Sequence, residues 1–160
     1  MKLFLTAFIV VLSTGYGIGL AFVEHTTSLS TPGVEQQFLG SIDPERMEEM
    51  RYPKSVNEMY VFIHNHVLAL SLIFFCVGAI FYFSSTVPES VKRFLLIEPM
   101  AAIVTTFGGI ALVRFVSPHF SWLVVISGGS LLVCYAAIVY LVMKELWFIG
   151  QRQGADATFT

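Results

Sequence analysis

Charged side chains are scarce in this chain of 160 residues. Asp, Glu, Lys and Arg together make up 12% of it, whereas hydrophobic residues make up 56%. Soluble domains carry roughly twice that charged fraction. The formal net charge is −2, so no basic surface is available to recruit nucleic acid. These shortages exclude an ordinary soluble domain and a nucleic-acid-binding module, and the length allows one domain at most.

Disulfide and catalytic patterns are missing as well. The two cysteines, Cys76 and Cys134, lie in apolar runs and neither has a CxxC partner, which argues against a disulfide framework or a thiolate zinc site. The chain contains no phosphate-binding loop, no HExxH motif and no Ser-His-Asp arrangement. We therefore expect no catalytic activity of its own, although an electron-transfer role stays compatible with the sequence.

Long apolar runs are what the chain does contain. A bilayer core of about 30 Å requires about 20 apolar residues in a helix. Four runs qualify, and they predict helices at about residues 3–24, 56–85, 94–116 and 120–148. Gly19-Leu20-Ala21 loosely resembles a signal-peptide cleavage site, but the uncharged run of 21 residues from Leu3 to Val23 is longer than a usual signal-peptide core. We therefore expect an all-α integral membrane four-helix bundle, with residues 1–150 as one transmembrane domain.

The distribution of Lys and Arg predicts the orientation of the bundle. Basic residues near the inner ends of the spans are Lys2, Lys92, Arg93, Lys144 and Arg152, whereas the loop at residues 24–58 contains seven acidic and three basic residues. Positive charge marks the cytoplasmic side. We expect a multi-pass protein of the bacterial inner membrane, with both termini and a tail at residues 151–160 in the cytoplasm.

The outer loop carries two helix-start signals. Asp43-Pro44-Glu45 combines an N-cap, a proline at the first helical position and an acid in the first turn, which predicts a short surface helix through about Met50. Ser55 and Glu58 have the spacing of a capping box. This box predicts that the second membrane helix begins just outside the membrane.

All four histidines fall on the outer side of this topology: His25, His64, His66 and His119. One interpretation is that they simply face water at the interface. The other is ligation of a metal or haem, because imidazole is a common metal ligand and histidines within spans tend to mark function. His64 and His66 point about 200° apart on a helix and cannot chelate one ion together. The more polar face of the helix favours His64 as the histidine inside the bundle.

Two cofactor models are consistent with these histidines. In the first, a b-type haem lies in the outer half of the bundle, ligated by His64 or His66 together with His25 or His119, and Arg114 contacts a propionate. In the second, three of the four histidines hold copper or zinc. Arg114 equally suits snorkelling to the interface or pairing with an acid of the outer loop.

Small residues and one acid complete the list of candidates. Gly15, Gly17 and Gly19 crowd the outer half of the first helix, where they favour close helix packing or leave room for a macrocycle. Glu98-Pro99 lies at the inner end of the third predicted helix. We interpret Glu98 as an interface anchor, with Pro99 at the first helical position, in preference to a proton path.

Several short motifs carry a resemblance to a family. They are His25-Thr26-Thr27-Ser28-Leu29, Pro32-Gly33, Tyr52-Pro53-Lys54-Ser55, Ile63-His64-Asn65-His66 and Ile97-Glu98-Pro99. With these motifs the chain resembles an uncharacterised family of small bacterial four-helix inner-membrane proteins with an HxH motif in helix 2. The resemblance implies the four-span fold and draws attention to His25, His64 and His66, and it implies no activity.

The leading hypothesis for function is a membrane subunit of a bacterial respiratory or electron-transfer complex that binds a cofactor, with haem b favoured, through histidines on its outer side. Its partners are then other membrane subunits and lipid, because so small and apolar a chain leaves much helix surface to cover. One alternative is a structural accessory subunit without a cofactor. Another is a copper or zinc handling protein at the outer membrane face.

Overall fold

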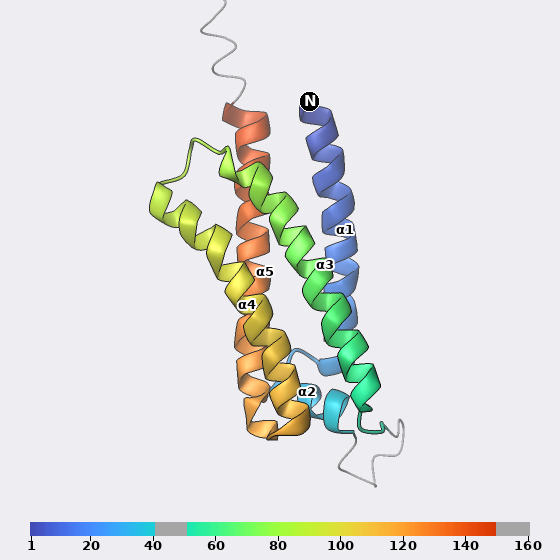
Figure 1. The fold of residues 1–160 in the computed structure, drawn as a ribbon. Coiled ribbons are helices and arrows are strands. Elements are labelled where there is room, and N and C mark those ends of the chain that lie inside the picture. Colours follow the sequence, from blue (N-terminus) through green and yellow to red (C-terminus); the bar gives the residue numbers. More distant parts are fainter. Residues whose placement is uncertain (41–50, 150–160) are drawn as a thin grey trace, which may run out of the picture.

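Four long apolar helices form the molecule. The structure, a computed structural model, describes residues 1–40 and 51–149. The membrane-spanning candidates are α1 (Lys2–Thr27), α3 (Val56–Tyr82), α4 (Glu89–Phe115) and α5 (Ser121–Lys144), shown in Figure 1. A 3₁₀ turn, η1 (Pro118–Phe120), precedes α5, and a π-helical turn, η2 (Glu145–Ile149), follows it. The predicted all-α membrane bundle is confirmed, although α4 begins five residues before the predicted start at residue 94.

The helices alternate in direction, so the bundle has two distinct ends. The N-terminus and the end of α5 lie at one end in Figure 1, which we call the termini end. The short helix α2 (Thr31–Leu39) lies at the opposite end, which we call the α2 end. It contacts α1, α4 and α5. The α2 end corresponds to the outer side of the predicted topology.

The helix α2 was not predicted, although its start is encoded locally. The Ser30 hydroxyl accepts a hydrogen bond from the backbone N–H of Gly33 at 3.2 Å, and Pro32 occupies the first turn, where its missing N–H costs nothing. The Ser121 hydroxyl of α5 donates to a carboxylate oxygen of Glu35 at 2.7 Å, which ties α2 to the bundle. The surface helix predicted through about Met50 lies outside the described residues.

The capping box at the start of α3 is confirmed. The Ser55 hydroxyl accepts from the Glu58 backbone N–H at 3.3 Å, and the Glu58 carboxylate accepts from the Ser55 backbone N–H at 2.7 Å. Both bonds satisfy N–H groups that have no partner within the helix. The box therefore fixes where the second span begins.

Replacing Ser55 with alanine is expected to lower the free energy of unfolding by about 1 kcal/mol, because a helix N–H then loses its acceptor. Thermal unfolding in detergent, followed by circular dichroism, measures this loss. Ser90→Ala is the matched control, because Ser90 is an exposed serine in the first turn of α4. Equal melting temperatures for the two variants would show that the cap contributes nothing.

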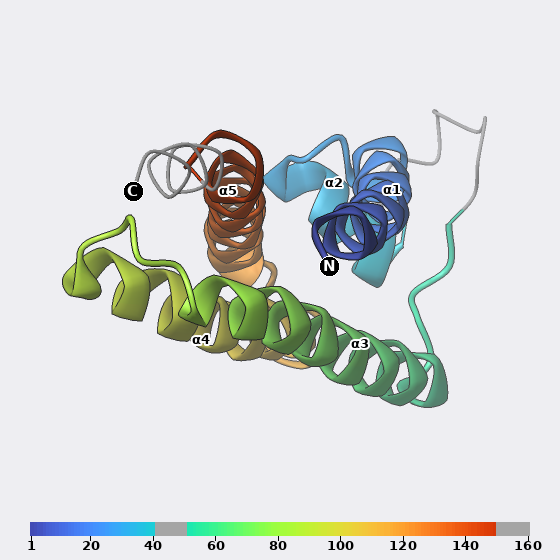
Figure 2. The same cartoon turned by 90° about the horizontal axis from the view of Figure 1, so that it is seen from above.

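Burial is unequal among the four spans. In an apolar stretch of 18 residues, 44% is buried for α4, but only 6% is buried for α1. Figure 2 shows α1 standing to one side of the other three spans. A groove of about 440 Å³, lined by residues of α1 and α5 that include Ile9, Ser13 and Met143, opens beside it. The core is thus built mainly by α3, α4 and α5, and the outward faces of the spans contact lipid.

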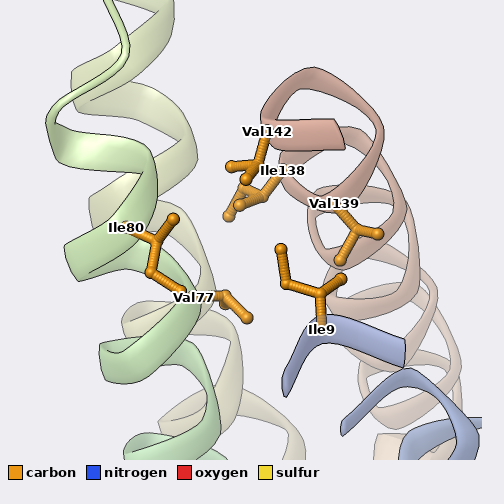
Figure 3. A pocket seen from close by; sticks show the side chains of 6 residues that line it. All are labelled: Ile9, Val77, Ile80, Ile138, Val139 and Val142. Atoms are coloured by element: carbon orange, nitrogen blue, oxygen red, sulfur yellow. The ribbon is translucent and has the colours of Figure 1, made fainter. Parts of the chain in front are cut away.

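An apolar contact joins α1 to the bundle near the termini end. Figure 3 shows Ile9 of α1 pointing toward side chains of α3 and α5. The residues that meet there are Ile9, Val77, Ile80, Ile138, Val139 and Val142, and the space between them is too small for a water molecule. This contact of α1 with α3 and α5 is therefore aliphatic and dry.

Candidate functional site

The four histidines lie at the α2 end but do not converge. His25 is in the last turn of α1, His64 and His66 are near the start of α3, and His119 is in η1. All four are exposed. Among the described residues, no three His, Cys, Asp or Glu side chains come together to hold a metal ion. Within one chain, the three-histidine copper or zinc site is therefore not assembled.

His66, and not His64, contacts a second helix. The His66 ring lies 4.2 Å from the Phe62 ring and 5.5 Å from the Phe107 ring of α4, measured between ring centroids. Its Nδ1 lies 2.8 Å from the Phe62 carbonyl oxygen one turn earlier. With Nδ1 donating to that carbonyl, Nε2 keeps its lone pair. The prediction that His64 faces the bundle is therefore wrong. The contact between Phe62 and Phe107 turns the face of α3 that carries His66 toward α4.

Three consecutive polar residues lie on the exposed surface of α3. His64, Asn65 and His66 are all exposed, and His64 is about 12 Å along the helix from its start at Val56. This depth places the triplet inside the span rather than in its first polar turn. Polar side chains within a membrane span are costly when they face lipid, and they usually face protein or a cavity. Because His64 and His66 point about 200° apart, they face different neighbours, and each needs a contact other than lipid.

Arg114 has a partner in the outer loop. Its Nε donates to the backbone carbonyl of Lys54 at 2.7 Å, and its guanidinium lies 5.6 Å from the centre of the Phe115 ring. Arg51 similarly donates through Nη1 to the Thr26 carbonyl at 2.7 Å. Both arginines thus fasten loop segments onto the ends of α1 and α4. For Arg114, the contact within the described residues is with a backbone carbonyl, and four acids of the loop, at residues 43, 45, 48 and 49, lie outside them.

A second candidate site lies between two of the spans, α4 and α5. Glu98 is half-buried between α4 and α5. One carboxylate oxygen accepts a hydrogen bond from the Ser130 hydroxyl, and the other accepts one from the Cys134 thiol at 2.9 Å. A carboxylate at mid-span costs about 3 kcal/mol on insertion scales. An acid held there by two polar partners on a neighbouring helix is a functional candidate.

The expected position of Pro99 at the start of its helix is wrong. The helix begins at Glu89, so Pro99 lies inside α4 and is fully buried. Proline is tolerated within membrane helices because neighbouring groups compensate for the lost backbone hydrogen bond. Glu98 therefore lies about 13 Å along α4 from its first residue and about 8 Å beyond Arg93, and its role as an interface anchor stays a prediction.

Separate hydroxyl groups lie along α4 and α5 between Glu98 and the α2 end. The Thr106 hydroxyl of α4 donates to the Ser127 hydroxyl of α5 at 2.7 Å, and both residues are buried. Ser127 lies one turn from Ser130 on α5, and Ser121, bonded to Glu35, lies farther along the same helix. We call the contact of α4 and α5 that contains these groups the polar seam. No sequence signal identified the seam, because it depends on how two helices pair.

The termini end carries a different polar cluster. The Glu145 carboxylate accepts hydrogen bonds from Ser84 and from both the backbone N–H and the hydroxyl of Ser85, at 3.0 and 3.1 Å for the latter two. The Lys92 ammonium donates to the Ser84 carbonyl. This cluster ties the α3–α4 turn to the end of α5. Because the α3–α4 turn already occupies both oxygens of the Glu145 carboxylate, we regard this cluster as structural.

Residues 28–154 match the Aq_1264_TM family, described as a transmembrane helical domain. The chain belongs to this family. A search of the curated proteins and a search of the solved structures gave no match. The family match confirms that the resemblance in sequence was to a transmembrane helical family, and it assigns no activity.

The part of the chain that matches the Aq_1264_TM family begins at Ser28, the C-cap residue of α1. It contains α2, α3, α4 and α5, and hence the HxH segment, the polar seam and Glu98. The helix α1, which is the least buried span, lies outside the match. The candidate sites therefore lie within the part that matches the family, apart from His25.

Proposed function

We propose that this protein is a subunit of an electron-transfer assembly in the inner membrane of a bacterium, and that it presents His66 to a b-type haem where a partner subunit packs. Support comes from the exposed His64-Asn65-His66 triplet on α3. Polar side chains exposed to lipid are unfavourable, whereas a partner subunit with a cofactor supplies polar contacts and a metal for the His66 imidazole to bind. The excess of Lys and Arg at the termini end supports cytoplasmic termini.

The observation that carries the haem proposal is the hydrogen bond of His66. Histidines that bind metal usually donate their other ring nitrogen to a carbonyl or carboxylate, which fixes the ring and its tautomer. The 2.8 Å contact from Nδ1 to the Phe62 carbonyl has this form and leaves Nε2 for iron. The rings of Phe62 and Phe107 pack against the His66 ring. A bound haem supplies one-electron transfer, and this chain supplies an axial ligand and an apolar wall.

The second axial ligand has to come from another chain or from a second histidine at the α2 end. Because His64 points away from His66, it is a poor second ligand to the same iron. His25 and His119 lie on other elements at the same end. The same geometry leaves two alternatives: an accessory subunit in which the triplet contacts a partner without a cofactor, and copper or zinc held jointly with a neighbouring chain at the outer face.

An absorption spectrum tests this proposal. We expect the tagged protein, purified in mild detergent from its own host with its partners, to show a Soret band and reduced α and β bands. His66→Ala should remove most of this absorbance, because the ligand is lost, whereas His64→Ala should retain it. The size of the complex on native electrophoresis tests the assembly separately.

Each outcome of this experiment has a distinct meaning. A large complex without haem bands supports the accessory-subunit alternative, and elemental analysis then tests for copper or zinc. Haem bands that survive in His66→Ala overturn the assignment of the ligand. A single chain surrounded only by lipid and detergent overturns the assembly itself.

A further inference from the structure

The groove between α1 and α5 lies in the termini half of the bundle. Its volume of about 440 Å³ falls within the usual range of ligand pockets. Figure 3 shows two of its lining residues, Ile9 of α1 and Val139 of α5. All of the residues that line it are Ile9, Val10, Ser13, Thr14, Val139 and Met143.

The hydroxyl groups in the groove are already engaged. The Ser13 hydroxyl bonds the Tyr135 hydroxyl at 3.0 Å, and the Thr14 hydroxyl donates to the Val10 carbonyl at 2.9 Å. The other lining side chains are apolar. The groove therefore offers a surface that suits a hydrocarbon chain.

One face of α1 leads from the groove to the termini end. Lys2, Thr6 and Ile9 follow one another at intervals of four and three residues, so they lie on the same face of the helix. Lys2 is about 10 Å along α1 from Ile9. On α5, Lys144 directly follows the groove residue Met143 in the sequence. Two lysines thus mark the end of the groove that is nearest the membrane surface.

A polar bridge joins α1 to the end of α5 at this level. The Trp147 indole N–H donates to the Thr6 hydroxyl at 3.0 Å, and that hydroxyl donates to the Lys2 carbonyl at 3.0 Å. Tryptophan is enriched at the level of the lipid headgroups. The bridge therefore brings the backbone of Lys2 close to the end of α5, at the boundary between the apolar and polar parts of the membrane.

The two lysines carry positive charge that nearby acids do not balance. Both side chains are exposed, and no hydrogen bond or ion pair occupies their ammonium groups in the described part of the chain. Glu145, which follows Lys144, directs its carboxylate to Ser84 and Ser85 of the α3–α4 turn. Lys2 and Lys144 are therefore available to an anion at the mouth of the groove.

We propose that this groove binds an anionic phospholipid, with one acyl chain along the groove and the phosphate between Lys2 and Lys144. Basic pockets between membrane helices on the cytoplasmic side bind anionic headgroups, and the apolar lining below the lysines suits the chain. A free phosphate would use the lysines and leave the groove empty, so the combination favours a lipid. Because α1 is the least buried span, a lipid held here also fastens it to α5.

Native mass spectrometry of the full protein in detergent tests the headgroup. The probes are phosphatidylglycerol and phosphatidylcholine with the same acyl chains, added to delipidated protein. We expect phosphatidylglycerol to bind roughly tenfold more tightly, because only its headgroup carries a net negative charge. Lys2→Gln and Lys144→Gln should each weaken its binding about fivefold. Arg93→Gln is the control and should not, because Arg93 lies on α4 and pairs with Glu89.

A second pair of variants tests the groove itself. Val10 lines the groove, whereas its neighbour Val11 does not. Both valines are more than half exposed, at 55% and 73%, so neither substitution disturbs the core. Val10→Phe should weaken the binding of phosphatidylglycerol roughly fivefold or more, as expected when an occupied site is overfilled. Val11→Phe should leave that binding unchanged.

Three results would overturn the proposal. The first is equal affinity for the two lipids. The second is a loss of binding in Arg93→Gln or Val11→Phe as large as in the groove variants, because the lipid then coats the bundle without a site. The third is competition by glycerol 3-phosphate as strong as by the lipid, because the site then binds a free phosphate. The groove lies at the opposite end of the bundle from His66, so this test and the haem spectrum have independent outcomes.

Discussion

Gly33→Ala is expected to lower the free energy of unfolding by about 3 kcal/mol, toward the upper end of the range for overpacked sites. A Cβ atom at Gly33 would lie 1.8 Å from the Thr27 carbonyl oxygen and 2.4 Å from its carbon. Both are backbone atoms, so no side-chain rotation relieves the overlap. The last turn of α1 or the whole of α2 has to move, and the contact of α2 with the bundle is weakened with it.

Two other glycines provide matched controls for this variant. Alanine at Gly108 or Gly128 meets no atom within 4 Å, and in a helix interior alanine is favoured over glycine by up to about 1 kcal/mol. These two variants should therefore melt at or above the temperature of the wild type in detergent, whereas Gly33→Ala should melt well below it. If all three variants have the same melting temperature, the close approach of α1 and α2 is not a feature of the folded protein.

The effect of Gly33→Ala should be concentrated at the α2 end. Arg51 bonds the Thr26 carbonyl and the side chain of Gln37, so a displaced α2 strains both contacts. Hydrogen exchange of α2 and of the first turns of α3 should rise, while the exchange of α4 and α5 near the termini end stays low. This pattern would show that the α2 end, where the histidines lie, is held together by a few backbone contacts.

The four-span fold was predictable because its causes are local in the sequence. Runs of about 20 apolar residues have few alternatives to a membrane helix. The start of α3 was located at its capping box, since Ser55 and Glu58 carry the signal by themselves. The start of α4 was predicted at residue 94, where the apolar run begins, whereas the helix already begins at Glu89 in the polar turn before that run.

The candidate sites were less predictable because they depend on contacts between helices. The sequence placed the histidines at one end of the fold, but it could not show that His66 rather than His64 meets Phe107. Nor could it pair Glu98 with Ser130 and Cys134, which lie more than thirty positions away on another helix. The signal for α2 was present in Ser30 and Pro32, and it was overlooked in favour of Asp43-Pro44.

Phe81→Ala is expected to lower the free energy of unfolding by about 3–5 kcal/mol, the usual range for a large aromatic removed from a packed core. Phe81 has no exposed surface and lies near the end of α3. In a membrane, the lost energy comes chiefly from packing contacts, because lipid is itself apolar. Unfolding by a denaturing detergent measures the change.

Phe75→Ala separates packing within the protein from contact with lipid. Phe75 lies on the same helix but keeps 65% of its surface exposed, so its ring faces lipid in both the folded bundle and the separated helices. Its removal should therefore change the unfolding free energy by less than about 1 kcal/mol, as for other surface substitutions. If Phe75→Ala were as costly as Phe81→Ala, the exposed face of α3 would have to be covered by protein, which would extend the proposed partner surface from the HxH segment toward the middle of α3.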